Sequence, residues 1–175
     1  MPPSSPRSGL ARWRVPLGFV VALVVGWFVA PTGRSLAIGL PIALAGQLLR
    51  IWAAGHLEKS REVTRSGPYR YTRHPLYAGS MLMGAGFAVA AWSVVVAVVI
   101  GVYLAATVLI AIRTEEAYLR ATFGDTYDQY ARGTAASVAR RFSLARAIRN
   151  KEYRSVLGFT VVSTVLTAVA LVRGG

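Results

Sequence analysis

The segment LYAGSMLMGAGFAVAAWSVVVAVVIGVYLAATVLIAIRTEE, Leu76–Glu116, carries no charged side chain before Arg113. A helix needs about 20 consecutive apolar residues to cross the hydrocarbon core of a membrane, so this segment is long enough for two crossings. Trp92 divides it near the middle and leaves room only for a tight turn between the halves. We therefore predict a hairpin of two membrane-spanning helices, over residues 76–91 and 93–112.

Three further apolar stretches, residues 15–30, 35–52 and 156–172, have a similar length and composition. Over the whole chain, 54% of the 175 residues are hydrophobic and only 15% are charged, a balance typical of membrane proteins. The sequence thus predicts an all-α, polytopic membrane protein with about five transmembrane helices in a single domain, residues 1–175. The first stretch follows several arginines, as in a signal peptide. Phe28, however, stands where a cleavage site needs a small residue, so we expect an uncleaved helix.

Basic residues are distributed unevenly between the two ends of the predicted helices. With five spans, the N-terminus and the long breaks at 53–75 and 113–155 share one side, and these breaks carry five and nine Lys or Arg residues. The opposite side keeps only Arg34 and Arg173. Because positively charged loops stay in the cytoplasm, we expect an integral protein of a bacterial inner membrane with its N-terminus and active site cytoplasmic. All seven acidic residues lie on that side too, so the net charge of +13 indicates topology and attraction to membrane lipids rather than nucleic-acid binding.

The break at 53–75 ends in an unusually polar run, GPYRYTRHPLY, Gly67–Tyr77. Pro75 favours a helix start directly after His74, where free backbone amides form a seat for an anionic group. Gly79 would let a ligand approach the helix backbone closely. This run has two interpretations that we weigh about equally. It is either a ligand site, or a group of aromatic residues at the membrane interface whose basic neighbours anchor it to lipid. A metal site is not expected, because no Cys, Asp or second His stands at ligand spacing from His74.

The break at 113–155 begins with two adjacent carboxylates, Glu115 and Glu116, just after the long apolar span. An acidic pair near the hydrocarbon boundary is costly unless a partner compensates its charge. One interpretation is a solvated helix end with neighbouring arginines as partners. The other is a binding site, since the aromatic residues of 118–130 could enclose a cationic ligand. Residues 133–155 alternate basic and apolar side chains and predict an interfacial segment on anionic lipid, to which we assign no catalytic role.

Residues 53–79 and 113–132 emerge on the same predicted face and could form one cytoplasmic cofactor pocket. Together they offer helix-start amides, a histidine, tyrosines and two carboxylates. A complementary ligand would carry an anionic part, a cationic part and a flat ring. S-Adenosylmethionine has this combination, although nucleotides and other zwitterions fit as well.

Two motifs in these segments resemble those of the isoprenylcysteine carboxyl methyltransferase family and the related phospholipid N-methyltransferases. One is Arg73-His74-Pro75-Leu76-Tyr77-Ala78-Gly79, and the other, one span later, is Glu115-Glu116 with the F-G-x-x-Y-x-x-Y tail of residues 123–130. The resemblance covers about residues 50–132, and the combination is specific although each piece alone is not. It implies an integral membrane methyltransferase that uses S-adenosyl-L-methionine. The acceptor would be a lipophilic small molecule or a lipidated substrate that presents a carboxylate, such as an isoprenylcysteine, or an amine.

The resemblance also implies roles for individual residues. The residues that would contact the cofactor are Arg61, Glu62, Val63, Thr64, Tyr69, His74, Pro75, Leu76, Tyr77, Gly79, Glu115 and Glu116. Residues 61–64 would contribute backbone contacts, and one glutamate of the pair would hold the cofactor's polar groups. Arg113 would be the arginine on the substrate side, and the predicted catalytic residues are Arg113, Glu116 and His74.

The type of acceptor decides which residues the chemistry needs. A carboxylate is already ionised at neutral pH and needs no general base. An amine must first lose a proton, which would give a glutamate or His74 the role of base. Two other functions stay open: an NADPH-dependent membrane reductase of the sterol-reductase-like group, and a non-enzymatic membrane scaffold. Gln47 and Arg50, toward the cytoplasmic end of the second span, are better placed to line a cofactor site than a transport path.

Overall fold

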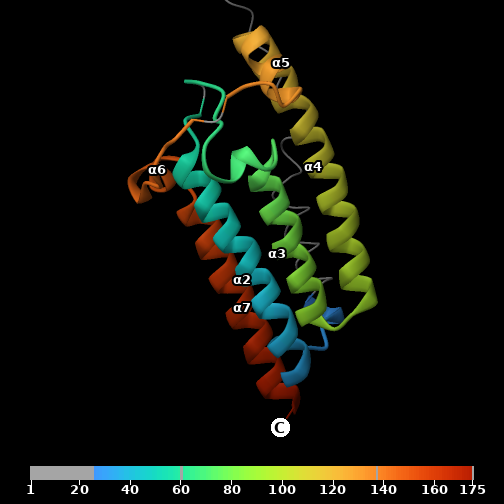
Figure 1. The fold of residues 1–175 in the computed structure, drawn as a ribbon. Helices are drawn as coiled ribbons and strands as arrows, with labels where there is room; N and C mark the ends of the chain where they lie inside the picture. Colours follow the sequence, from blue (N-terminus) through green and yellow to red (C-terminus); the bar gives the residue numbers. More distant parts are fainter. Residues whose placement is uncertain (1–25, 60, 137, 175) are drawn as a thin grey trace, which may run out of the picture.

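The computed structural model describes residues 26–59, 61–136 and 138–174, and within these ranges it contains helices and no strand. The elements are the α-helices α2 (Gly33–His56), α3 (Pro75–Ala91), α4 (Val94–Phe123), α5 (Asp125–Ala131), α6 (Leu144–Arg149) and α7 (Tyr153–Gly174), with one 3-10 turn, η1 (Gly67–Arg70) (Figure 1). The all-α fold predicted from the sequence is confirmed.

Three of these helices, α2, α4 and α7, are long and apolar enough to cross a membrane, and α3 is a shorter apolar helix of 17 residues. These four correspond to the second through fifth predicted spans. The first predicted span, residues 15–30, lies mostly outside the described residues, so the number of about five spans stays a prediction. α4 differs from its predicted span at one end, since it continues past Glu115 and Glu116 to Phe123.

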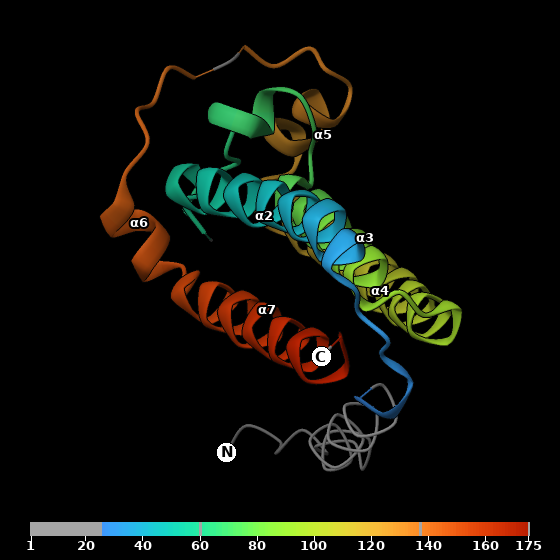
Figure 2. The ribbon, with the colours of Figure 1, turned by 90° about the horizontal axis from the view of Figure 1, so that it is seen from below.

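The centre of the bundle is the pair α2 and α3, whose backbones approach closely because glycines line their contact. A Cβ atom on Gly39, Gly46 or Gly86 would clash with the backbone of the opposite helix. Small residues at such contacts allow membrane helices to associate through van der Waals packing, since the hydrophobic effect does not act between helices in lipid. α4 packs against α3, and α7 packs against α2 (Figures 1 and 2).

Tight turns hold one end of the bundle together, and polar segments gather at the other end. Trp92 adopts a left-handed conformation (φ 49°) between α3 and α4. The hydroxyl of Ser35, at the start of α2, donates to the carbonyl of Ala90 near the end of α3 (3.0 Å). Figure 1 shows η1, α5, α6 and their connections at the opposite end, away from the C-terminus. The two polar segments singled out in the sequence therefore lie at the same end of the bundle.

Candidate active site

A cavity of about 730 Å³ opens at the polar end of the bundle, between α2, α3, α4 and the segments before η1 and α7. The predicted cofactor residues that line it are Glu62, Val63, Thr64, Tyr69, Leu76, Tyr77 and Glu115. Thr107 and Ile110 of α4 continue the wall toward the apolar middle of that helix. The cavity thus joins a polar mouth to an apolar side, and it has the volume of a typical small-molecule site.

The other predicted residues lie outside the lining of this cavity: Arg61, His74, Pro75, Gly79, Glu116 and Arg113. Pro75 is buried at the first position of α3, and Gly79 packs against α2 beside the Arg50 side chain. Arg113 is exposed on α4, next to the lining residue Thr114. The catalytic role of Arg113 therefore stays a prediction.

His74 and Glu116 form a pair outside the cavity lining. His74 Nε2 lies 3.1 Å from Glu116 Oε1, and because a carboxylate only accepts hydrogen bonds, Nε2 is the ring nitrogen that carries the proton. Arg73 and Arg120 also approach the Glu116 carboxylate, at 3.2 and 3.7 Å. This cluster connects His74, the residue before α3, with α4. It therefore fixes the polar run of residues 67–77 against the helix that carries Glu115 and Glu116.

Four carboxylates line the cavity, and Glu115 is the one that forms no ion pair with an arginine of the described segments. The other three are paired, with N–O distances of 2.7, 2.7 and 2.9 Å: Glu58 with Arg146, Glu62 with Arg140, and Glu152 with Arg50. The His74 ring lies next to Glu115, with its Nδ1 4.0 Å from Oε2. This Nδ1 is buried and has no hydrogen-bond partner in the described part of the chain. Tyr77 also hydrogen-bonds to Glu115. A carboxylate that lines a cavity without an arginine partner indicates a place for a cationic ligand group.

A buried polar network around Arg50 forms the inner wall of the cavity. Arg50 donates from Nε and Nη2 to the two carboxylate oxygens of Glu152 (2.9 and 3.0 Å), and from Nε to the Ser155 hydroxyl (2.9 Å). Gln47 donates to Glu152 (3.3 Å) and accepts from Ser155 (2.8 Å). The network ties α2 to the start of α7. A bidentate arginine–carboxylate pair with satisfied neighbours can be buried without leaving an uncompensated charge.

Residues 133–155, for which the sequence predicts contact with lipid and no catalytic role, also contribute to the wall of the cavity. Asn150 and Glu152 both line the cavity. Asn150 also donates to the carbonyls of Ala54 and Leu57 (both 2.9 Å), so it closes the end of α2. The one available signal was Glu152 itself, a lone carboxylate directly before an apolar span, which is costly without a partner.

Two short helices cover the polar end of the cavity. α6 packs on the end of α2, and the hydrogen bond that Arg146 donates to Glu58 (2.7 Å) lowers the pKa of this carboxyl group. α5 covers η1, where Tyr130 donates its hydroxyl to the Tyr69 carbonyl (2.8 Å). Burial raises the pKa of Tyr130 to about 12, so this donor keeps its proton at physiological pH. Leu144 and Ile148 of α6 are exposed, which leaves that face free for the predicted contact with lipid.

The chain is similar to three proteins of known name. It is 31% identical over 140 residues to the cobalt-zinc-cadmium resistance protein CzcN of Cupriavidus metallidurans, a match that covers 74% of this chain and 63% of the relative. It is 30% identical over 151 residues to the nickel-cobalt-cadmium resistance protein NccN of Alcaligenes xylosoxydans xylosoxydans, covering 81% of this chain and 68% of the relative. It is 34% identical over 86 residues to the protein-S-isoprenylcysteine O-methyltransferase of Schizosaccharomyces pombe, covering 49% of this chain and 36% of the relative.

The chain thus spans about two thirds of the length of the two resistance proteins and about one third of the methyltransferase. No solved structure matches it significantly. The family model for phospholipid methyltransferases matches residues 35–126, more than half of the chain. This range begins in α2 and ends just inside α5, so it contains the residues of α2, α3 and α4 that line the cavity. The chain therefore belongs to the phospholipid methyltransferase family.

Proposed function

We propose that this protein is an integral membrane methyltransferase that transfers a methyl group from S-adenosylmethionine to a lipophilic acceptor. The reaction would take place at the cytoplasmic face of a bacterial inner membrane. The observation that carries this proposal is the cavity, which is lined at its polar mouth by Glu115, a carboxylate without an arginine partner in the described structure, and along α4 by apolar residues. Family membership supports the reaction class.

The lining residues fit the chemical groups of S-adenosylmethionine. Glu115 would hold a cationic group, and Tyr69 and Tyr77 offer aromatic surface next to it. His74 lies outside the cavity lining, with Nδ1 beside Glu115 and Nε2 on Glu116, so it would orient Glu115 rather than touch the ligand. His74 and Glu116 are therefore positioning residues in this proposal. When bound, S-adenosylmethionine supplies an electrophilic methyl group.

The acceptor would reach the cavity along its apolar side, where Thr107, Ile110 and Leu119 of α4 line the wall. An acceptor carboxylate would need only orientation and the exclusion of water. An acceptor amine would need a base, and Glu115 is the candidate because it is the lining carboxylate without an arginine partner. The similarity to the protein-S-isoprenylcysteine O-methyltransferase of Schizosaccharomyces pombe supports a carboxylate acceptor.

The test is methyl incorporation in membrane vesicles that contain the wild-type chain, the Glu115→Gln variant or no added protein. The vesicles would receive S-adenosylmethionine with a tritiated methyl group, and the label would be counted in the organic extract. We expect incorporation with the wild-type chain and a decrease of about tenfold or more with Glu115→Gln, since a contact to a charged group is lost. Label released by mild base identifies a methyl ester, and stable label identifies a methylated amine. Wild-type incorporation no higher than in vesicles without the protein would contradict the proposal.

A further inference from the structure

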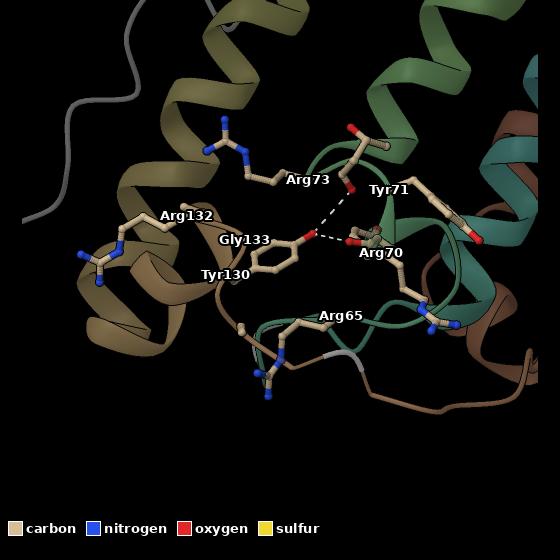
Figure 3. Close-up of a pocket in the computed structure, with 11 residues that line it drawn as sticks. Arg65, Arg70, Tyr71, Arg73, Tyr130, Arg132 and Gly133 are labelled. Atoms are coloured by element: carbon tan, nitrogen blue, oxygen red, sulfur yellow. Dashed lines mark hydrogen bonds between the residues drawn. The ribbon is translucent and has the colours of Figure 1, made fainter.

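A second cavity, of about 500 Å³, lies beside the first and has no part in the proposed methyl transfer. Its walls are residues 65–73 on one side and the end of α5 with the turn after it, residues 130–135, on the other. Tyr69, Arg73 and Tyr130 line both cavities, so these three residues form the partition between them. Figure 3 shows Tyr130 at the centre of this smaller cavity, with its hydroxyl directed toward the loop that carries Arg70.

The charge of the smaller cavity is entirely positive. Its charged lining residues are Arg65, Arg70, Arg73 and Arg132, and no carboxylate lines it. The larger cavity, in contrast, is lined by four carboxylates. The arginine side chains of the smaller cavity come from two segments of the chain and lie on different sides of Tyr130, with their guanidinium groups directed away from its ring (Figure 3). The two cavities therefore share one partition, but only the larger one is lined by carboxylates.

Two of these arginines lack a carboxylate partner. Arg73 is 3.2 Å from Glu116, but Arg65 and Arg132 form no ion pair with any residue that the structure describes. The Nε of Arg65 is buried and has no hydrogen-bond acceptor in the same part of the chain. A buried N–H group without an acceptor is costly, and like charges that line one cavity repel, so an anion that enters beside Arg65 stabilises the arrangement.

We propose that this smaller cavity binds a phosphate group. Guanidinium groups match phosphate oxygens in geometry and donate paired, charge-assisted hydrogen bonds to them. The Thr72 residue in the lining adds a hydroxyl group that can also donate. The phosphate belongs either to the headgroup of an anionic phospholipid or to a free phosphate ion, because both present the same oxygens to the arginines. This inference does not depend on the methyl-transfer reaction.

The experiment follows the thermal unfolding midpoint of the purified full chain in detergent. The titrants are inorganic phosphate and short-chain phosphatidylglycerol, at constant ionic strength set with sodium chloride. The test variant is Arg65→Gln/Arg132→Gln, because neither residue lines the larger cavity. The matched control is Arg141→Gln/Arg154→Gln, which removes the same charge from exposed positions outside both cavities.

We expect a saturable rise of the midpoint in the wild-type protein and in the control variant. In Arg65→Gln/Arg132→Gln the apparent Kd should be about tenfold or more weaker, since two charged donors are lost. A rise with inorganic phosphate assigns the site to free phosphate, and a rise with phosphatidylglycerol alone assigns it to a lipid headgroup. The proposal is overturned if the folded wild-type protein responds to neither titrant, or if both double variants give the same apparent Kd. If the test variant does not fold, Arg132→Gln alone, at an exposed position, replaces it with the same expectations.

Discussion

Glu115 and Glu116 are neighbours in the chain but face different surroundings. Glu115 lines the cavity, whereas Glu116 accepts contacts from His74, Arg73 and Arg120 outside that lining. Successive residues of an α-helix point about 100° apart, and here Glu115 points into the cavity with Thr114, while Glu116 points toward His74. The sequence predicts the pair as part of the site. It does not distinguish their roles, because the rotation of α4 depends on how this helix packs against α3.

The structure predicts that Glu116→Gln reduces stability. The substitution removes the carboxylate charge that His74, Arg73 and Arg120 contact, and we expect the free energy of unfolding to decrease by about 1–3 kcal/mol. Chemical unfolding of the purified protein in mixed micelles, followed by circular dichroism, measures this decrease. The control is Asp125→Asn, at an exposed carboxylate outside the cavity, for which we expect a change within about 0.5 kcal/mol. Equal effects of the two substitutions would contradict the role assigned to Glu116.

The contact between Glu58 and Arg146 predicts a dependence of stability on pH. The hydrogen bond from Arg146 lowers the pKa of Glu58 from 4.5, so the folded state binds the proton of this group less readily than the unfolded state does. The stabilisation is therefore complete above pH 4.5 and is lost as the pH falls through the lower pKa of the folded state. Thermal unfolding midpoints of wild type and Glu58→Gln should differ at pH 7 and converge in acid. A difference that stays constant down to the acid limit would show that the carboxylate charge is not responsible.

The helices α3 and α4 begin where the sequence predicts, because local signals set their first residues. Pro75 cannot donate a backbone hydrogen bond and favours a helix start, and Trp92 with Ser93 separates two apolar runs. The far end of α4 is not predicted correctly, since hydropathy changes at Ile112 but the helix does not end there. Residues 114–122 are rich in Glu, Ala, Leu and Arg, which are good helix formers, and Gly124 ends the helix with φ 47°.

The contact between α2 and α3 predicts a specific effect of a single methyl group. Gly86→Ala would place a Cβ against the backbone of Ala43, so the helices must separate. We expect the free energy of unfolding to fall by about 1–3 kcal/mol, as for other overpacked contacts. Gly101→Ala in α4 is the matched control, because a Cβ there has no neighbour within 4 Å in the described structure. Unfolding in mixed micelles should separate the two variants, and a Gly86→Ala protein as stable as Gly101→Ala would contradict the close packing.

The whole molecule brings together residues that are far apart in the sequence. Arg50 and Glu152 are 102 positions apart, yet they form the inner wall of the cavity. A sequence motif covers only neighbouring residues, so it predicts the lining positions within 62–77 and Glu115. The lone carboxylate of Glu152 signals a need for a partner, but the sequence does not say that the partner is Arg50. The missing information is the path of the chain after α5, which returns across the polar end and docks α6 on α2 (Figure 2).

The orientation in the membrane is testable because the chain has no cysteine. Gly33→Cys lies at the start of α2, and Thr126→Cys lies in α5 at the opposite end of the bundle; both positions are exposed. If the polar end is cytoplasmic, a membrane-impermeant maleimide added to spheroplasts should label Gly33→Cys but not Thr126→Cys until the cells are lysed. The reverse pattern would place the cavity on the outer face.

The most direct test of the proposed function is a calorimetric titration of the purified full chain with S-adenosylmethionine, and separately with NADPH. We expect saturable binding of S-adenosylmethionine by the wild-type protein and no binding of NADPH. Affinity should fall about tenfold or more in Glu115→Gln, which loses a contact to a charged ligand group, and stay unchanged in Asp125→Asn. A folded wild-type protein that does not bind S-adenosylmethionine, or that binds NADPH instead, would contradict the account.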